Sequence, residues 1–465
     1  MILWRPAQQA RAALAVTRLT LVVGIAVTFA GSTATAQFGG GMGGFGFGAV
    51  GGIAIDAEGI VQNIDPRALE ALAAERRATL AGASLPTAAG DLRKVSLARI
   101  IAAVGAATAD KKDVPADVAF LGGLERITHV FVDPDGHDIV LAGPGGVPVV
   151  DAAGNLVARE SGRPLLHLED LITALRAIGD ARQGGLTCSI DPTPEGIARV
   201  QRFLAAQQTM GPDQEAVFRG MEQALGPQRI TVGGVPADSR FARVLVAADY
   251  RLKRIGMGLE ASGVKEVPSY LALVPAGGRA ATLPRFWLEA EYEPITRDPD
   301  GLAWRINGRR MKCLTENDVL ERGAVQRGKG AADAVAAKWC AAMTQHYDAV
   351  AAKHPVFTEL VGCVDLAVVA ALIQGRNLAG QAGLDLGLLV DAEKLPLPKY
   401  EVPTSVPTVA SGLKKGTTWL LSASGGVLVQ PWAFAANVAD AADVGPARTA
   451  ALAARPADAP QSWWD

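Results

Sequence analysis

The sequence predicts an α+β or α/β protein, in which helices flank a mixed sheet that contains several β-hairpins. Three observations favour this class. Several short runs alternate apolar and polar residues, several longer runs repeat apolar residues at helical spacing, and Asp-x-x-Gly turns separate many of the short runs. We expect one large folded unit with a glycine-rich, flexible N-terminal tether and an alanine- and proline-rich, flexible C-terminal tail.

The first 36 residues are typical of an export signal. An apolar run, "LTLVVGIAVTFAG", follows a stretch that has no acidic residue and contains Arg5, Arg11 and Arg18. Small residues then stand at Ala34 and Ala36, as a signal peptidase requires. We predict a signal peptide over 1–36, cleavage between Ala36 and Gln37, and a periplasmic or extracellular protein. A retained membrane anchor is the alternative, although the apolar run is short for a bilayer.

Charge and hydropathy exclude several partners. The chain has 45 Lys+Arg and 47 Asp+Glu. This balance leaves no excess of positive charge that would attract nucleic acid. We expect no membrane span after signal removal. The most apolar later run, "ELVGCVDLAVVAALIQGR", is interrupted by Asp365 and predicts a buried helix. No complete nucleotide-binding or zinc motif occurs, so we predict no cofactor.

From the tether onward, the chain divides into five segments. Residues 37–52 are rich in glycine and phenylalanine, and residues 53–112 predict a strand pair followed by helices near 66–82 and 91–108. Residues 113–315 predict an α/β core, with hairpins at "RITHVFVDPDGHDIVLAG" and "VPVVDAAGNLVA" and two strand–helix units. Residues 316–437 predict a helical subregion with a closing hairpin, "TTWLLSASGGVLVQPWAF", and residues 438–465 predict a disordered tail.

The helix from Ser239 to Met257 carries the clearest amphipathic pattern. Its apolar residues lie on one face, and its cations lie off that face at Arg240, Arg243, Arg251, Lys253 and Arg254. We interpret the cations as a solvated face, partly neutralised by the i, i+4 pair of Asp249 and Lys253. The alternative is a surface for an acidic partner or a cell-wall polymer.

Carboxylates gather at the ends of two predicted strands. If these strands are parallel neighbours, Asp191, Thr193 and Glu195 would lie near Asp238, Ser239 and Arg240, because open α/β sheets bind ligands at such ends. Asp191 and Asp238 would then be the catalytic pair of a hydrolase, with Thr193, Glu195, Ser239, Arg240 and Lys253 as binding residues. The simpler interpretation is helix capping, with acidic residues favouring the helix dipole.

A turn at "DPDGHD" and the cysteines raise two further questions. Asp133, Asp135 and Asp138 are candidate metal ligands beside His137, but Asp-x-x-Gly recurs at three other hairpins, which favours a turn in which glycine takes the left-handed conformation. The four cysteines match no zinc pattern. Two interpretations stay open for them: a disulfide between Cys340 and Cys363, or four buried thiols.

Several longer strings carry a family resemblance. They are "HVFVDPDGHDIVLAGP", "TCSIDPTPEGIARVQRFL", "GVPADSRFARVLVAADYRLKRIGMGLE", "RDPDGLAWR", "VDLAVVAALI" and "SASGGV". Together they resemble an uncharacterised family of exported proteins from planctomycete-type bacteria, a domain of unknown function, over roughly residues 50–435. The resemblance implies an exported protein and implies no activity or ligand.

Two functions therefore remain as hypotheses. The first is a non-enzymatic structural or binding role in the cell envelope, with an envelope polymer or another exported protein as partner. The second is a secreted hydrolase or carbohydrate-active enzyme that uses Asp191 and Asp238, which would require these carboxylates to lie about 5–10 Å apart across a cleft.

Overall fold

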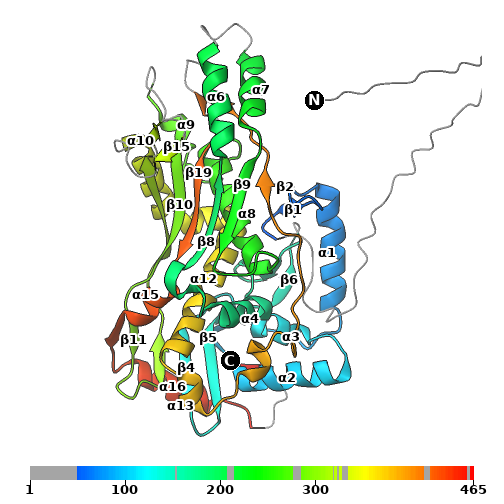
Figure 1. Ribbon diagram of the computed structural model, residues 1–465. Helices are drawn as coiled ribbons and strands as arrows, with labels where there is room; N and C mark the ends of the chain where they lie inside the picture. The colour runs from blue at the N-terminus through cyan, green and yellow to red at the C-terminus, as the bar shows by residue number, and fades with distance from the viewer. Residues whose placement is uncertain are drawn as a thin grey trace, which may run out of the picture. The chain divides into compact units, whose positions relative to one another are not determined.

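The protein is built on two mixed β-sheets with helices packed against them, an α+β fold (Figure 1). The computed structural model describes residues 50–151, 154–206, 214–275, 284–317, 319–321, 324–326, 333–412, 419–420, 422–457 and 461–465. All of them belong to one compact unit. The predicted signal peptide, its cleavage site and residues 37–49 of the tether lie outside the described residues.

The six-stranded sheet occupies the upper half of Figure 1. Its strands are, in spatial order, β13 (Arg310–Asn317), β10 (Pro284–Glu291), β19 (Ser424–Val429), β8 (Leu186–Asp191), β9 (Gln228–Gly233) and β16 (Ser405–Val406). Only the β10–β19 pair is parallel. Strand β19 begins with the sequence "SGG", and its glycines are required because the strand lies very close to its neighbours. A Cβ at Gly425 would lie 1.7 Å from the Phe286 carbonyl oxygen.

The seven-stranded sheet occupies the lower half of Figure 1. Its strands are, in spatial order, β20 (Val438–Asp440), β11 (Ile295–Arg297), β12 (Ala303–Arg305), β4 (His129–Asp133), β5 (Asp138–Gly145), β3 (Gly90–Ser96) and β21 (Trp463–Trp464). In the described part of the chain, four two-stranded ribbons complete the strands: β1 (Ile53–Ile55) with β2 (Val61–Asn63), β6 (Pro148–Val150) with β7 (Leu156–Ala158), β14 (Val319–Glu321) with β15 (Ala324–Gln326), and β17 (Ser411–Gly412) with β18 (Trp419–Leu420).

The helices of the first half of the chain are α1 (Pro66–Leu80), α2 (Leu97–Asp110), α3 (Ala116–Ala119), the short 3₁₀ turn η1 (Leu121–Gly123), α4 (Leu168–Ala177), α5 (Ala181–Gly184), α6 (Pro194–Ala206) and α7 (Gln214–Leu225). Those of the second half are α8 (Arg240–Gly256), α9 (Tyr270–Leu273), α10 (Ala334–Gln345), α11 (Tyr347–Lys353), α12 (Val356–Gly375), α13 (Leu378–Ala382), α14 (Gly387–Val390), α15 (Pro431–Ala436) and α16 (Val444–Ala453).

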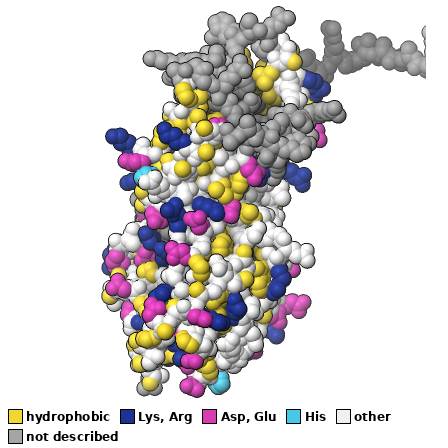
Figure 2. Space-filling view, turned by 90° about the vertical axis from the view of Figure 1, so that its left-hand side faces the viewer, with side chains coloured by type: hydrophobic (Ala, Val, Ile, Leu, Met, Phe, Trp, Pro, Cys, Tyr) yellow, Lys and Arg dark blue, Asp and Glu magenta, His cyan; other side chains and the backbone are white. Residues whose placement is uncertain are grey.

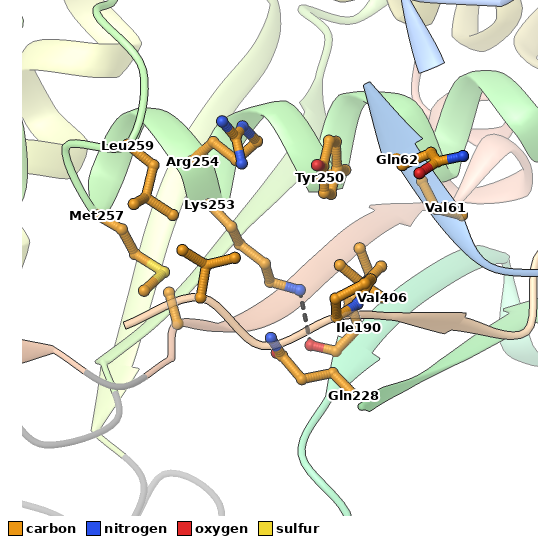
Figure 3. A pocket seen from close by; sticks show the side chains of 13 residues that line it. Val61, Gln62, Ile190, Gln228, Tyr250, Lys253, Arg254, Met257, Leu259 and Val406 are labelled. Carbon is orange, nitrogen blue, oxygen red and sulfur yellow. Dashed lines mark hydrogen bonds between the residues drawn. The ribbon is translucent and has the colours of Figure 1, made fainter. Parts of the chain in front are cut away.

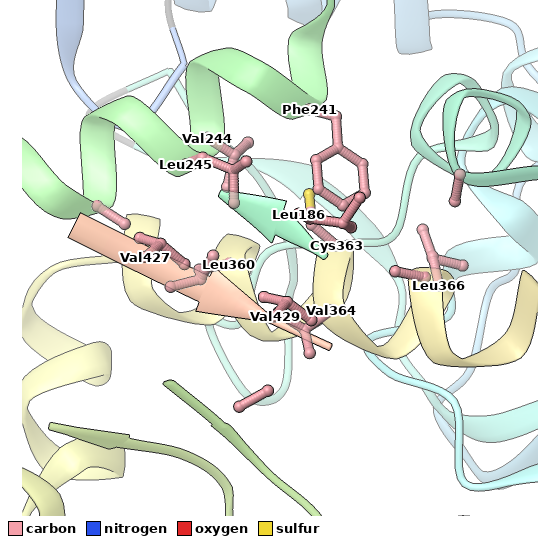
Figure 4. Packing of buried hydrophobic residues seen from close by; sticks show 14 of the residues in the cluster. Leu186, Phe241, Val244, Leu245, Leu360, Cys363, Val364, Leu366, Val427 and Val429 are labelled. Atoms are coloured by element: carbon pink, nitrogen blue, oxygen red, sulfur yellow. The ribbon is translucent and has the colours of Figure 1, made fainter. Parts of the chain in front are cut away.

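Helices α8 and α12 pack together with the six-stranded sheet to form the centre of the main core. Figure 4 shows Phe241, Val244 and Leu245 of α8 beside β8, β19 and α12, where they meet Leu186, Val427, Val429, Leu360, Cys363 and Val364. Each fully buried side chain of this size contributes about 1.5–3 kcal/mol through removal of apolar surface from water. Among the described helices, α12 is the one long and apolar enough to cross a membrane, and 83% of its apolar window is buried inside the protein.

Three predicted elements were wrong. The predicted helix over 91–108 begins only at Leu97, because residues 90–96 form β3, which joins the seven-stranded sheet. The predicted closing hairpin does not form, since β18 pairs with β17 whereas β19 pairs with β10 and β8. In both cases, long-range strand pairing decides the structure, and the local pattern does not.

The predicted disordered tail was the third error, because its described residues, 438–457 and 461–465, complete the seven-stranded sheet. Strand β20 pairs with β11, and β21 pairs with β3 at the other edge. Between them, α16 buries Val444 and Ala451 against Phe131 in a small second core, which also holds Trp464. Alanine has the highest helix propensity, so an alanine-rich segment forms a helix when it can pack against an apolar surface.

Candidate functional site

The helix α8 is the centre of the candidate site, and it is almost entirely buried. Ser239 caps it as predicted, its Oγ accepting a hydrogen bond from the Ala242 N–H at 3.1 Å. Of its seventeen residues, fifteen are buried, and only Arg251 and Arg254 are not. The predicted solvated basic face was therefore wrong, since Arg240, Arg243 and Lys253 lie in the interior.

Arg240, the first residue of α8, forms two buried ion pairs. Its Nη1 contacts Asp170 of α4, and its Nη2 lies 2.7 Å from Oε2 of Glu359 of α12. All three side chains are less than a tenth exposed. The guanidinium thus connects three helices through two carboxylates, a geometry for which the planar arginine fork is suited. The adjoining cavity has about 10 Å³, room for about one water molecule.

Burial changes the acidity of this cluster. Burial raises the pKa of Glu169, next to Asp170, to about 8; the Asp170 carboxylate adds to the shift, and Arg240 partly offsets it. Burial by itself would lower the pKa of Arg240, but Asp170 and Glu359 outweigh it, so the pKa is raised. The cluster therefore holds its cation firmly, while one neighbouring carboxyl group stays protonated near neutral pH.

Lys253, one turn from the other end of α8, joins the helix to the six-stranded sheet. Its Nζ donates to Asp249 Oδ2 at 2.8 Å, to the Ile190 carbonyl of β8 at 2.7 Å and to the Gly425 carbonyl of β19 at 3.3 Å. An ammonium has three donors, and these contacts use all three. Burial raises the pKa of Asp249 to about 6, although Lys253 opposes that shift.

A pocket of about 130 Å³ opens beside Lys253 (Figure 3). Figure 3 shows Tyr250, Lys253, Arg254 and Met257 of α8 and its C-terminal turn along one side, with β2, Ile190 and Val406 around the rest. The apolar part of the lining comprises Val61, Ile190, Met257, Leu259, Val406, Pro407, Val409 and Ala423. The polar part comprises Gln62, Gln228, Tyr250, Lys253 and Arg254. The arrangement suits a small apolar group, since a cavity of similar size in another protein binds benzene.

The structure does not bring Asp191 and Asp238 together. Strands β8 and β9 are antiparallel, and Asp191 pairs with Arg229 at the start of β9, so the two strands end at opposite edges. Asp191 lies near Asp249 and adds to its raised pKa, whereas Asp238 precedes α8 and contacts Lys399 at 3.7 Å. Asp249 lies eleven positions after Asp238, which corresponds to about 16 Å along a helix. The antiparallel register therefore sends Asp191 and Asp238 to opposite edges of the sheet, and it gives no support to the proposed glycosidase pair.

The remaining residues of the predicted strand-end cluster are capping or surface residues. Thr193 caps α6, its Oγ1 accepting from the Gly196 N–H at 3.0 Å, and Glu195 is exposed in the first turn of that helix. Of the set predicted to converge, Ser239 and Arg240 lie at one end of α8 and Asp191 lies near Lys253 at the other. Helix capping therefore accounts for Thr193 and Ser239.

The aspartates of the "DPDGHD" turn bind an arginine. Arg455 contacts Asp133 and Asp138, each at 2.9 Å, while Asp135 is exposed at the tip of the hairpin. Asp138 also accepts from Ser96 Oγ at 2.6 Å. The predicted left-handed glycine was wrong here, because His137 takes φ +48° instead of Gly136. Glycine does take that conformation in the other three Asp-x-x-Gly turns, at Gly59, Gly154 and Gly301.

The predicted disulfide between Cys340 and Cys363 is not formed. All four cysteines are free and buried, and the Cys340 Sγ lies 3.5 Å from the Cys313 Sγ. Cys363 lies instead near Asp170, and burial raises its pKa well above the usual value. The alternative of four buried thiols describes this arrangement.

Sequence reasoning missed the partners of the buried cations. Glu169, Asp170 and Glu359 belong to helices that are otherwise apolar on the same faces, and Asp365 lies in the middle of α12, 2.9 Å from Arg310 Nε. An acidic residue inside an apolar helical run is the signal that was available, because a buried carboxylate requires a partner. Which cation pairs with each buried carboxylate depends on tertiary packing.

Comparison with known proteins identifies one segment of this chain. The family described as "Protein of unknown function (DUF1598)" matches residues 188–270, under a fifth of the chain. The match runs from β8 through α6, α7, β9 and α8 to the start of α9. It includes one of the strings that carried the resemblance, "GVPADSRFARVLVAADYRLKRIGMGLE", and all but the first residue of another, "TCSIDPTPEGIARVQRFL". The comparisons with curated proteins and with solved structures find no match. Seven pocket residues lie within the matched segment: Ile190, Gln228, Tyr250, Lys253, Arg254, Met257 and Leu259.

Proposed function

We propose that this chain is an exported, non-enzymatic binding protein of the cell envelope that holds a small apolar group in the pocket beside Lys253. The signal-like N-terminus and the resemblance to exported planctomycete-type proteins support export. On the face drawn in Figure 2, basic and acidic side chains are interspersed, as suits a partner that is not a polyanion.

One observation carries the binding role. The ammonium of Lys253 borders the pocket, but its three donors are held by Asp249, Ile190 and Gly425. A lysine engaged in this way is neither a free nucleophile nor a free base. Binding would therefore be driven mainly by the removal of apolar surface from water. A positively charged ligand would be disfavoured because it would lose its hydration, while the described lining contains no acidic side chain to pair with it.

The pocket is tested with 1-hexanol and hexylammonium as probes. We expect 1-hexanol to raise the melting temperature and to bind at least tenfold more tightly than hexylammonium, as calorimetric titration would measure. The variant Val409→Trp should remove the binding because Val409 lines the pocket. Val402→Trp is the matched control: both valines are 41% exposed, and Val402 does not line the pocket. Binding that survives in Val409→Trp, or an equal loss in both variants, would contradict the proposal.

Export is tested separately by processing of the full chain in a bacterium that has a periplasm. We expect the mature protein in the periplasmic or extracellular fraction, with Gln37 as its first residue by mass spectrometry of the N-terminal peptide. Ala36→Gln should block this processing, because a bulky side chain does not fit next to the cleavage point, while Thr35→Gln should be processed normally. An uncleaved chain that stays in the cytoplasm would disprove export.

A further inference from the structure

A second hollow lies on the outer face of the six-stranded sheet, the face turned away from α8 and α10. Along β10, Phe286 and Leu288 point inward, and Phe286 contacts Trp339 of α10 at 4.5 Å between ring centroids. Arg285, Trp287 and Glu289 alternate with them and belong to the outer face. This face carries a groove of about 510 Å³, within the usual range for ligand sites.

Strand register explains why the groove forms. Trp287 pairs with Gly426, Gly426 pairs with Ser189, and Ser189 pairs with Thr231, so these four residues form one row across four strands. Gly426 contributes no side chain between Trp287 and Ser189, whose strands are about 10 Å apart at two strand spacings. A Cβ there would lie 1.8 Å from the Cys188 carbonyl oxygen, so the gap in the row is fixed by backbone packing.

The lining combines one aromatic surface with groups that both donate and accept hydrogen bonds. The Arg285 guanidinium lies 5.3 Å from the Trp287 ring centroid, and its Nε is buried and donates no hydrogen bond in the described part of the structure. Glu289 is 3.6 Å from Lys312, so its charge is partly compensated. The hydroxyl groups around the groove belong to Thr187, Ser189 and Thr231.

We propose that this groove binds a neutral polysaccharide chain, with one pyranose ring stacked on the Trp287 indole. A pyranose has an apolar face of C–H groups and a rim of hydroxyl groups, and the groove offers an indole beside hydroxyl, carboxylate and guanidinium groups. A peptide would need the free backbone groups of a sheet edge, but β10, β19 and β8 are paired on both sides. This inference rests on the envelope role proposed above and specifies the class of polymer that the protein would bind. The groove on the six-stranded sheet is separate from the Lys253 pocket.

The test uses pull-down on insoluble chitin and cellulose, which are both neutral polysaccharides, followed by titration with chitohexaose and cellohexaose. We expect the protein to bind at least one polysaccharide, and Trp287→Ala to weaken that binding by about tenfold or more. Trp287→Phe should stay within about threefold of the original affinity, because phenylalanine keeps an aromatic face. Trp432→Ala is the matched control, a half-buried tryptophan outside the groove with the Arg182 guanidinium 3.7 Å from its ring centroid.

Two results would overturn the proposal: no binding to any of these polysaccharides, or unchanged binding by folded Trp287→Ala. Circular dichroism and the melting temperature verify folding of each variant. Val409→Trp, which blocks the Lys253 pocket, should leave polysaccharide binding unchanged. Failure at the sheet groove is therefore distinguishable from failure of the pocket or of export.

Discussion

At its first residue, α8 buries Arg240 between two carboxylates, whereas thirteen residues later it buries Lys253 between one carboxylate and two backbone carbonyls. Beside Arg240 there is about 10 Å³ of space, and beside Lys253 there is about 130 Å³. The planar guanidinium fills its surroundings and ties three helices together. The ammonium is a compact point charge, and apolar side chains next to it leave room for an occupant.

The difference shows that a buried cation does not by itself mark a binding site. Both residues are almost fully buried, and both donate to at least two acceptors that come from distant parts of the sequence. What separates them is the space around the charge. Arg240 thus belongs to the framework, and Lys253 forms part of the framework and of the pocket wall at once.

Removal of Arg240 is the strongest test of this contrast. Arg240→Met should destabilise the protein by about 3–5 kcal/mol, because it leaves Asp170 and Glu359 buried without their cation. Unfolding in guanidinium chloride at neutral pH measures the change. Arg297→Met is the control: its ion pair with Asp440 is exposed, and we expect a loss of at most about 1 kcal/mol.

Neutralising the carboxylates at the same time sharpens the result. In Arg240→Met/Asp170→Asn/Glu359→Gln, the buried charges are gone, and we expect much of the lost stability to return. If Arg240→Met alone cost no more than Arg297→Met, the description of Arg240 as a framework residue would fail.

Local patterns in the sequence were sufficient to predict the elements that are stabilised by residues close together in the chain. The cap at Ser239, the hairpin around "DPDGHD" and the helix at residues 66–82 follow from residues close together in the chain, and the structure confirms them. The buried helix α12 was also predictable, because Asp365 interrupts a run that is otherwise apolar. Its partner Arg310, 55 residues earlier, was not.

The errors share one physical cause, which is pairing between distant segments. The direction of β9 relative to β8 decides whether Asp191 and Asp238 meet, and nothing local fixes that direction. Residues 438–465 looked disordered because they are rich in alanine, proline and aspartate and contain few large apolar side chains, but Trp464 and Ala451 complete a core whose other half lies in β4, β5 and β12. Likewise, the amphipathic pattern of α8 could not reveal that carboxylates of α4 and α12 pair with Arg240.

Removal of Lys253 should have a smaller effect that depends on pH. The pKa of Asp249 is about 6 in the folded protein, whereas the ordinary value for an aspartate side chain is 3.8. The folded state therefore binds more protons between these two values, and stability falls as pH rises through that window. Lys253→Met removes the nearby cation, raises the pKa of Asp249 further and extends the decline above pH 6. We expect the destabilisation by Lys253→Met to be larger at pH 8 than at pH 5, by up to about 3 kcal/mol.

Urea unfolding of Lys253→Met at both pH values measures this difference. Lys394→Met, which removes a surface ion pair, is the control and should show no such dependence on pH. Adding Asp249→Asn should abolish the difference, and an equal cost at both pH values would show that Asp249 is not the group that Lys253 keeps ionised.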